Sequence, residues 1–319
     1  MKLELVNEII ECLGGERRLF CFYPGCHWVN TLVNAMQQRG LSTVKYGELN
    51  TLCDTNVRDK PVIKNALKYF ADGKLSITDL ACLTPAETQM FNLSLAAWGD
   101  GSRGWDQTSR NQSNLVLQVN FPTLHVKKYE ALVKPDDLEH GPFESWCHPV
   151  HQEGRKTMAW ARMDIDFATN TVLIEEIQND WLRKAQQAWR KIEKRRQKNP
   201  TLKPATINSE IGASYEAFSK YINQELAVYE KHWAEATMAA AIHFIRSELG
   251  ISNIYYHTFE TGIKLKQVSG KPPLSLYTKL PKSFGFKVTQ ATPEFLLRDK
   301  NSRRYLKAIG RAEWFYLGE

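Results

Sequence analysis

The chain passes from an apolar run directly into closely spaced polar groups at Thr171-Val172-Leu173-Ile174-Glu175-Glu176-Ile177-Gln178-Asn179-Asp180-Trp181. Residues two apart in a β-strand lie on the same face, so Glu176, Gln178 and Asp180 are expected to point the same way. The opposite face then holds Glu175, Ile177 and Asn179. We predict a core strand that carries a candidate site at its C-terminal end. Strand carboxylates that only pair with nearby Lys or Arg give the same pattern, so a structural role stays open.

The segments around this strand predict an α/β (α+β) protein with a mixed, mostly antiparallel sheet flanked by helices. Residues 114–121, 157–166 and 171–178 have strand-like patterns, and the turn at 168–170 predicts an antiparallel meander. A long helix is expected from about Ala213 to Leu249, before Gly250. Further strands at 253–258, 286–289 and 313–317, and a short helix at 274–280, complete the predicted order.

The first part of the chain has a different pattern. Apolar residues at helical spacing predict a helical N-terminal domain over residues 1–98, including a helix through Met90, Phe91 and Leu95. A polar, glycine-rich stretch at 99–113 predicts a linker, although such a stretch also suits phosphate binding. The second domain then covers residues 114–319, with a basic helical insertion at about 181–212.

Composition indicates a soluble protein large enough for two ordinary cores. Of the 319 residues, 43% are hydrophobic and 24% are charged. No apolar run approaches the roughly 20 residues that span a bilayer. The first eight residues carry acids where a signal peptide is basic and then apolar. We therefore expect a cytoplasmic protein that does not enter a membrane; the sequence indicates no particular oligomeric state.

The cysteines do not predict a metal site. None of the six belongs to a CxxC pair, so a zinc ribbon or thioredoxin-type redox site has no support. Cys26-His27 and Cys147-His148, with His151 nearby, match no standard ligand spacing. We expect no metal.

A net charge of +7 favours a polyanionic partner if the excess is concentrated. It is concentrated between Trp181 and Lys198, where Glu193 is the only acid. The cations are Arg183, Lys184, Arg190, Lys191, Lys194, Arg195, Arg196 and Lys198. This helix suits a nucleic acid or a phosphorylated cofactor, with Trp181, Trp189 or Tyr256 as stacking groups. A solvated helix face is the alternative.

The order of antiparallel strands, long helix, strand, short helix and two closing strands resembles the GCN5-related N-acetyltransferase (GNAT) fold. A closer likeness is the segment Leu274-Ser275-Leu276-Tyr277-Thr278-Lys279-Leu280 leading to Phe284-Gly285-Phe286. It resembles a Leu-Tyr-x-Lys-Leu-Gly-Phe segment that closes many of these enzymes, in which the tyrosine is often the general acid. The resemblance implies a GNAT-like second domain, acetyl-CoA or another acyl-CoA as cofactor, and Tyr277 as the acid. Pro281 to Phe284 are inserted before the glycine.

A second resemblance begins at Glu176-Ile177-Gln178-Asn179-Asp180-Trp181. This is similar to the Glu-Ile-Gln-Ser-Asp-Trp signature of a domain found in large polyvalent proteins of phages and mobile elements. That domain also has a Trp-x-Glu helix, matched by Trp233 and Glu235, and a Tyr-to-Leu-Pro-Lys segment, matched from Tyr277 to Lys282. Ala234 departs from the pattern, which has His there.

Two functions follow as expectations. In an acyltransferase, Glu176 or Asp180 would be a general base with a pKa raised by burial, Gln178 would orient substrate, and Tyr277 would return a proton. Other group transfer or hydrolysis at these carboxylates is also open. Substrate or partner contacts are expected from Trp181, Arg183, Lys184, Trp233, Glu235, His257, Lys279 and Lys282.

The alternative is a non-catalytic GNAT-like module that binds nucleic acid or a protein through the basic helix. The sequence favours this alternative at one point. GNAT enzymes hold the cofactor pyrophosphate with an Arg/Gln-x-x-Gly-x-Gly/Ala loop before the long helix. In this chain that interval contains the basic helix, and its only glycine turn lies at Ser209-Glu210-Ile211-Gly212-Ala213-Ser214.

Overall fold

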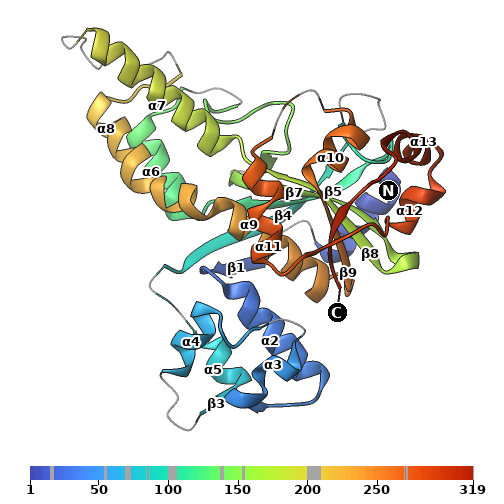
Figure 1. The fold of residues 1–319 in the computed structure, drawn as a ribbon. Coiled ribbons are helices and arrows are strands. Elements are labelled where there is room, and N and C mark those ends of the chain that lie inside the picture. The colour runs from blue at the N-terminus through green and yellow to red at the C-terminus, as the bar shows by residue number, and fades with distance from the viewer. Residues whose placement is uncertain are drawn as a thin grey trace.

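The computed structural model describes residues 1–14, 18–53, 56–68, 73–83, 85, 87–99, 106–136, 140–152, 155–199, 210–268, 270 and 272–318. Within these ranges a large mixed sheet is flanked by helices on both faces, and a smaller lobe adjoins it (Figure 1). The predicted fold class is therefore confirmed.

The large sheet has the strand order β1-β4-β5-β7-β8-β9-β11-β10, and β6 pairs with β7 outside this path. Its strands are β1 (Arg18–Phe22), β4 (Gln89–Trp98), β5 (Asn114–Asn120), β6 (His151–Gln152), β7 (Arg155–Asp166), β8 (Thr171–Gln178), β9 (Asn253–His257), β10 (Lys287–Thr289) and β11 (Trp314–Leu317). All pairs are antiparallel except β8 with β9. The predicted meander is present as β5, β7 and β8.

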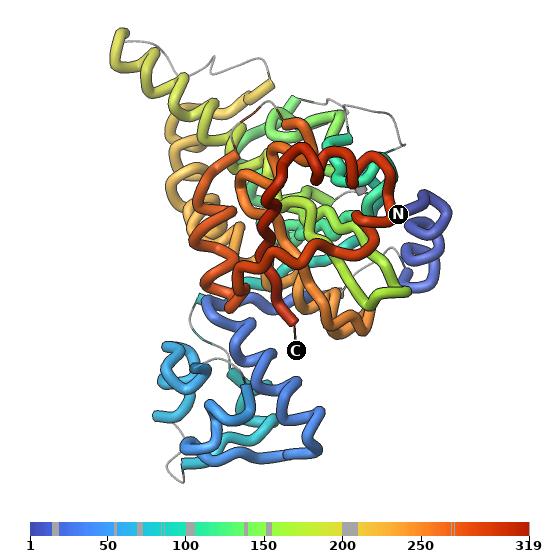
Figure 2. Tube along the Cα trace, turned by 45° about the vertical axis from the view of Figure 1, so that its right-hand side comes forward, coloured from blue at the N-terminus to red at the C-terminus, as the bar shows by residue number. Residues whose placement is uncertain are grey.

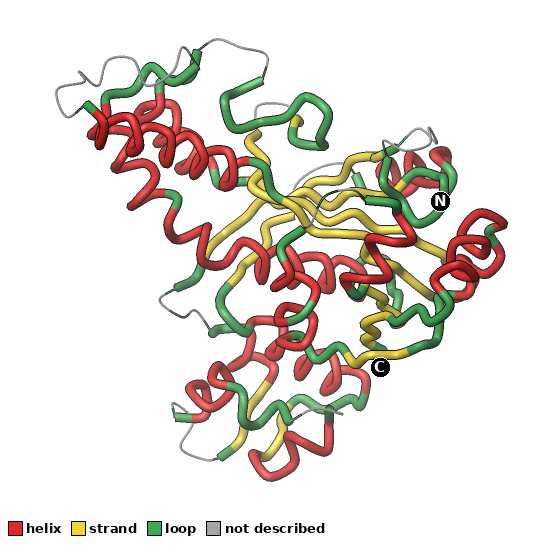
Figure 3. The backbone as a smooth tube through the Cα atoms, turned by 45° about the horizontal axis from the view of Figure 1, so that its top comes forward, coloured by secondary structure: helices red, strands yellow, loops and turns green. Residues whose placement is uncertain are grey.

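Helices cover both faces of the sheet (Figure 3). One face packs into the main core with α1 (Leu3–Leu13) and α9 (Ala227–Ser247), whose Ala236, Ala240 and Phe244 are buried. On the other face, α12 (Glu294–Arg298) and α13 (Lys300–Ile309) enclose a second apolar cluster around Trp314. The small residues of α9 allow close approach to the strands.

The remaining elements are α2 (Cys26–Gln38), β2 (Thr43–Lys45), η1 (Tyr46–Glu48), α3 (Leu49–Leu52), α4 (Pro61–Leu67), β3 (Lys74–Ser76), α5 (Ile77–Ala81), α6 (Thr123–Val133), η2 (Phe167–Thr169), α7 (Trp181–Lys198), α8 (Tyr215–Lys220), η3 (Tyr221–Glu225), α10 (Phe259–Lys266), η4 (Leu274–Tyr277) and α11 (Lys279–Ser283). Helices α2 to α5 with the pair β2-β3 form the small lobe, seen at the bottom of Figure 2. None of the helices in the described ranges combines the length and apolar character that crossing a membrane requires.

The predicted helix through Met90, Phe91 and Leu95 is wrong because these residues lie in β4, and the stretch 1–98 predicted as helical also contains β1, β2 and β3. Strands β1 and β4 pair with each other, and β4 joins the large sheet through β5. Phe91, Leu93 and Leu95 are buried at every second position, so the period is that of a strand. The spacing of Met90, Phe91 and Leu95 fits a helix as well, and pairing with β1 and β5 selects the strand.

The stretch predicted as a linker is in part a packed segment. Residues 100–105 lie outside the described residues, but Ser109 and Ser113 are buried. Arg110 forms an ion pair with the buried Asp164 of β7, at 2.5 Å. Residues 106–113 therefore form part of the wall over β7 and β8.

Helix α7 lies within the predicted basic helical insertion, and its buried residues are Trp181, Leu182, Ala185 and Ile192. Its C-terminal part stands away from the sheet beside α8 and α6 (Figures 1 and 2). The long helix predicted over 213–249 is present as α8, η3 and α9 in succession, where η3 is a π-helical turn.

Candidate functional site

A cavity opens where the parallel strands β8 and β9 stop pairing. Their register ends at Ile174 and Tyr256, whereas β8 continues to Gln178 and stays paired with β7. Beyond His257 the chain turns into α10, which begins at Phe259. The backbone thus separates at the carboxyl ends of two parallel strands, a common place for ligand sites in α/β sheets.

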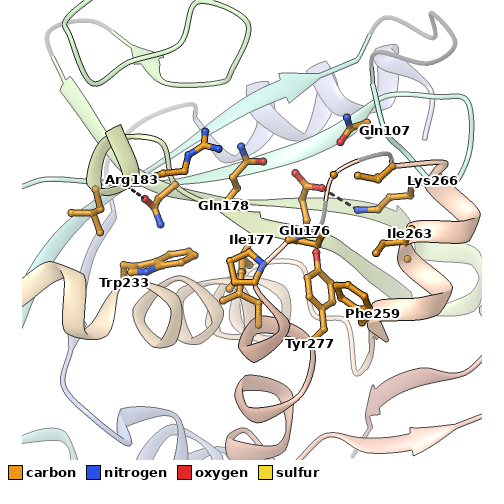
Figure 4. A pocket seen from close by; sticks show the side chains of 18 of the residues that line it. Gln107, Glu176, Ile177, Gln178, Arg183, Trp233, Phe259, Ile263, Lys266 and Tyr277 are labelled. Atoms are coloured by element: carbon orange, nitrogen blue, oxygen red, sulfur yellow. Dashed lines mark hydrogen bonds and ion pairs between the residues drawn. The ribbon is translucent and has the colours of Figure 1, made fainter. Parts of the chain in front are cut away.

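The cavity has a volume of about 770 Å³, and residues from both faces of the sheet line it (Figure 4). This size is within the usual range of small-molecule and cofactor sites. Its polar lining is Gln107, Glu176, Gln178, Asn179, Arg183, Gln186, Gln187, Arg190, Glu230 and Lys266. Its apolar lining includes Ile177, Leu182, Trp233, Phe259, Ile263, Val268, Leu276 and Tyr277.

A β-bulge places Glu175 and Glu176 in separate surroundings. Met163 pairs with Ile174 and Arg162 pairs with Glu176, so Glu175 is an extra residue in β8. The Glu175 side chain is completely buried, whereas that of Glu176 is 13% exposed and reaches the cavity.

Glu176 is held between two buried cations. Its Oε2 lies 2.7 Å from Nη2 of Arg162 and 3.0 Å from Nζ of Lys266. Burial alone raises the pKa of the Glu176 carboxyl, but Arg162 and Lys266 outweigh burial and hold the pKa at about 2. The expectation of a raised pKa is therefore wrong, and Glu176 is ionised at neutral pH.

A second buried cluster forms around Glu175, the chain neighbour of Glu176, with Ser109 and His257. Ser109 donates to Glu175 from its backbone N–H at 2.9 Å and from its hydroxyl at 2.8 Å. Nε2 of His257 lies 3.0 Å from the same carboxylate. Burial lowers the pKa of His257, so its neutral imidazole donates a hydrogen bond to the ionised Glu175. This cluster fixes the bulge.

We expect Ser109→Ala to lower the free energy of unfolding by about 1–3 kcal/mol, because Glu175 then keeps its buried charge with one donor fewer. Urea unfolding measures the change. Ser275→Ala, at an exposed position of η4, is the control and should change stability by less than about 0.5 kcal/mol. Equal effects of the two substitutions would contradict this reading of the cluster.

Glu176, Gln178 and Asp180 were predicted to share one face of the strand. Glu176 and Gln178 both line the cavity, but Asp180 does not. Strand β8 ends at Gln178, and Asp180 has helical dihedral angles as the N-cap of α7. Its carboxylate is buried against His148 and Arg183, both at 2.5 Å. Burial raises the pKa of the Asp180 carboxyl, but His148 and Arg183 together lower this pKa by more than burial raises it. The carboxyl therefore stays ionised at neutral pH.

Tyr277 reaches the cavity from η4, and its hydroxyl points toward Glu176 (Figure 4). It is 6% exposed, and its ring stacks on that of Tyr256 at 5.4 Å between centroids. Burial raises the pKa of the Tyr277 hydroxyl, so it is protonated at neutral pH. Glu176, Gln178 and Tyr277 therefore line the same cavity.

The predicted binding residues divide into two groups. Arg183 and Trp233 line the cavity. Trp181 and Tyr256 are buried, and Nε1 of Trp181 donates to the Tyr221 hydroxyl, so neither is accessible for stacking.

The other predicted binding residues lie outside the cavity. Lys184 donates to the carbonyl of Glu144, and Glu235 accepts from the backbone N–H of Gly25. His257 is buried beside Glu175. Lys279 and Lys282 are exposed outside the cavity lining.

The sequence interpretation missed Arg162 and Lys266. Arg162 lies within the apolar segment predicted as strand 157–166, and a cation there requires a buried partner. Lys266 lies in α10, in a stretch predicted as loop. The sequence signal for this helix is Thr258, whose hydroxyl accepts from the N–H of Thr261 and caps the helix.

Within the described residues no group of His, Cys, Asp and Glu side chains is arranged to hold a metal ion. Comparison of the chain with protein-family models, curated proteins and solved structures found no significant match.

Proposed function

We propose that this protein transfers an acyl group from an acyl-CoA to an acceptor that enters the cavity between β8 and β9. The observation that carries the proposal is the position of Tyr277, whose protonated side chain lines the cavity at the point where these parallel strands separate. The order of elements along the chain, with antiparallel strands before the long helix α9 and then β9, η4, β10 and β11, is the feature on which the GNAT resemblance rests.

The lining residues fit such a cofactor. Arg183 and Arg190 lie on one side of the cavity, where they suit phosphate groups. Trp233, Phe259 and Ile263 provide an apolar wall for an uncharged chain. In this proposal Arg183 and Arg190 of α7 bind the cofactor phosphates, which is the task of the glycine-rich loop in GNAT enzymes.

The protein's own groups then have distinct tasks. A bound acyl-CoA supplies the activated thioester. Tyr277 would donate a proton to the sulfur as the C–S bond breaks and the acyl–acceptor bond forms, and the proton released by the acceptor would return to Tyr277 through solvent. Ionised and doubly paired, Glu176 is a poor base, and we assign it to holding Arg162 and Lys266. Gln178 offers both a donor and an acceptor to orient the acceptor substrate.

Calorimetric titration with acetyl-CoA tests the proposal. We expect saturable binding that Arg190→Ala weakens about tenfold or more, because a charge-assisted hydrogen bond is lost. Arg196→Ala is the matched control, since Arg196 lies on another face of α7 over the ring of Tyr215. No binding of acetyl-CoA, or equal losses in the two variants, would remove the proposal.

A further inference from the structure

The exposed side of α7 carries cations with no carboxylate beside them. Arg190, Lys191, Lys194, Arg195 and Lys198 are exposed, and within the described part of the chain no ion pair is recorded for them. Glu193, the only acid of the helix, accepts from the hydroxyl of Tyr215. Acids three or four residues away usually balance the cations of a solvated helix, and Glu193, the single acid of α7, has this spacing only to Arg190 and Arg196.

The cations form two rows on the helix. Arg183, Arg190, Lys194 and Lys198 are spaced by seven, four and four residues and share one side. Arg183 and Arg190 of this row line the cavity, so the row leads out of it. Lys184, Lys191 and Arg195 form the second row beside it. From Arg183 to Lys198 the first row covers about 22 Å at 1.5 Å per residue.

An exposed tryptophan lies next to the start of this helix. Trp146 is 81% exposed, although the residues on both sides of it are anchored. The carbonyl of Glu144 accepts from Lys184 of α7, and His148 contacts Asp180 at the N-cap of α7. Glu144 is also paired with Lys156 at 2.9 Å. The loop is thus fastened to α7 while the indole ring of Trp146 faces solvent.

A row of cations beside an exposed aromatic ring is the combination that single-stranded nucleic acids require, since phosphates meet cations while bases stack. An acidic protein needs the cations but not the ring. A base must leave a duplex before it can enter a cavity, which favours a single strand.

We propose that α7 and Trp146 bind a single-stranded nucleic acid, and that this strand carries the acceptor group into the cavity. The assignment of the acceptor rests on the acyl transfer proposed above, whereas the binding surface does not. The phosphates lie along Lys191, Lys194, Arg195 and Lys198, which leaves Arg183 and Arg190 for the cofactor. A base stacks on Trp146, and the end of the strand reaches Gln178.

The test uses the full chain and labelled RNA and DNA single strands of about 12 nucleotides, within the usual site size. Binding is measured by fluorescence anisotropy over a series of salt concentrations. We expect the Lys191→Gln/Lys194→Gln/Arg195→Gln variant to reduce the salt slope by about 2, because each lost phosphate contact contributes roughly 0.7. Trp146→Ala should weaken binding about tenfold or more at each salt concentration.

Matched controls come from distant surfaces. Lys300→Gln/Arg303→Gln/Lys307→Gln removes the same charge from the exposed side of α13. Phe167→Ala removes an exposed aromatic ring from the turn between β7 and β8. Both controls should bind like the unchanged protein. Equal losses in the α7 and α13 variants, or no binding at low salt, would overturn the proposal.

Two further readouts separate the possible failures. Equal binding of polyglutamate would overturn the nucleic-acid assignment in favour of an acidic protein. A 4-thiouridine strand should crosslink to the peptide containing Trp233, and crosslinks confined to other surfaces would overturn delivery into the cavity. Acetyl-CoA is titrated into the same samples. If the protein binds the strand but not acetyl-CoA, only the proposed acyl transfer is overturned. If it binds acetyl-CoA but not the strand, only the proposed nucleic-acid surface is overturned.

Discussion

Replacing Glu176 with glutamine is expected to lower the free energy of unfolding by about 3–5 kcal/mol, because it leaves two buried cations without their carboxylate. The side chains of Arg162 and Lys266 are only 1% and 3% exposed, so water cannot replace the lost partner. Urea unfolding of the purified variant measures the loss, with the midpoint and the slope fitted separately.

Glu230 provides the control, because it is a cavity carboxylate at an exposed position, where it accepts from Gln186 at 2.7 Å. Glu230→Gln should change stability by less than about 1 kcal/mol. Adding Lys266→Met to Glu176→Gln should restore part of the loss, since one of the two unpaired charges is then gone. A Glu176→Gln variant as stable as the Glu230→Gln variant would show that the cations are solvated.

The ion pairs of Glu176 with Arg162 and Lys266 also make the free energy of unfolding depend on pH. The folded-state pKa of Glu176, about 2, lies below its ordinary value of 4.5. Its contribution to stability is therefore fully present above pH 4.5 and is lost as the pH falls toward 2. The acid limb of an unfolding profile should be shallower in Glu176→Gln than in the unchanged protein.

The second half of the sheet could be predicted because its signals are local. Strands β7 and β8 are apolar runs joined by a short turn. The spacing of apolar residues alone predicts the order from β8 through the helices to β9. The position of β4 depends on partners that are distant in sequence. Leu93 pairs with Arg18 on one side and with Val119 on the other, and a helical spacing of the same residues cannot reveal either contact.

The site was predictable in part for the same reason. Alternation placed Glu176 and Gln178 on one face, but the helix begins at Trp181, and this turns Asp180 away from the cavity. The pKa of Glu176 depends on Lys266, which lies 90 residues away in the chain. A carboxylate at a strand end therefore gives the position of a site, while its protonation state depends on partners that only the fold brings together.

Tyr277→Phe is expected to reduce kcat of the proposed acyl transfer by about 10²-fold or more, because general acid catalysis by a positioned group contributes roughly 10²–10⁴. Acetyl-CoA binding should change little, since the ring and its stacking on Tyr256 remain. The measurement is steady-state kinetics with the acceptor found for the enzyme, together with calorimetry of the variant. Tyr255→Phe, on the same strand as Tyr256 but outside the cavity lining, is the control.

The pH profile separates a proton donor from a residue that only fills space. Burial raises the pKa of Tyr277, so its hydroxyl stays protonated through neutral pH and loses its proton only at alkaline pH. The rate of the proposed acyl transfer by the unchanged protein should fall on the alkaline side as the donor is lost. The phenylalanine variant has no donor to lose, so its lower rate should lack this alkaline fall. An unchanged alkaline limb in Tyr277→Phe would assign the proton to another group and leave Tyr277 as part of the wall.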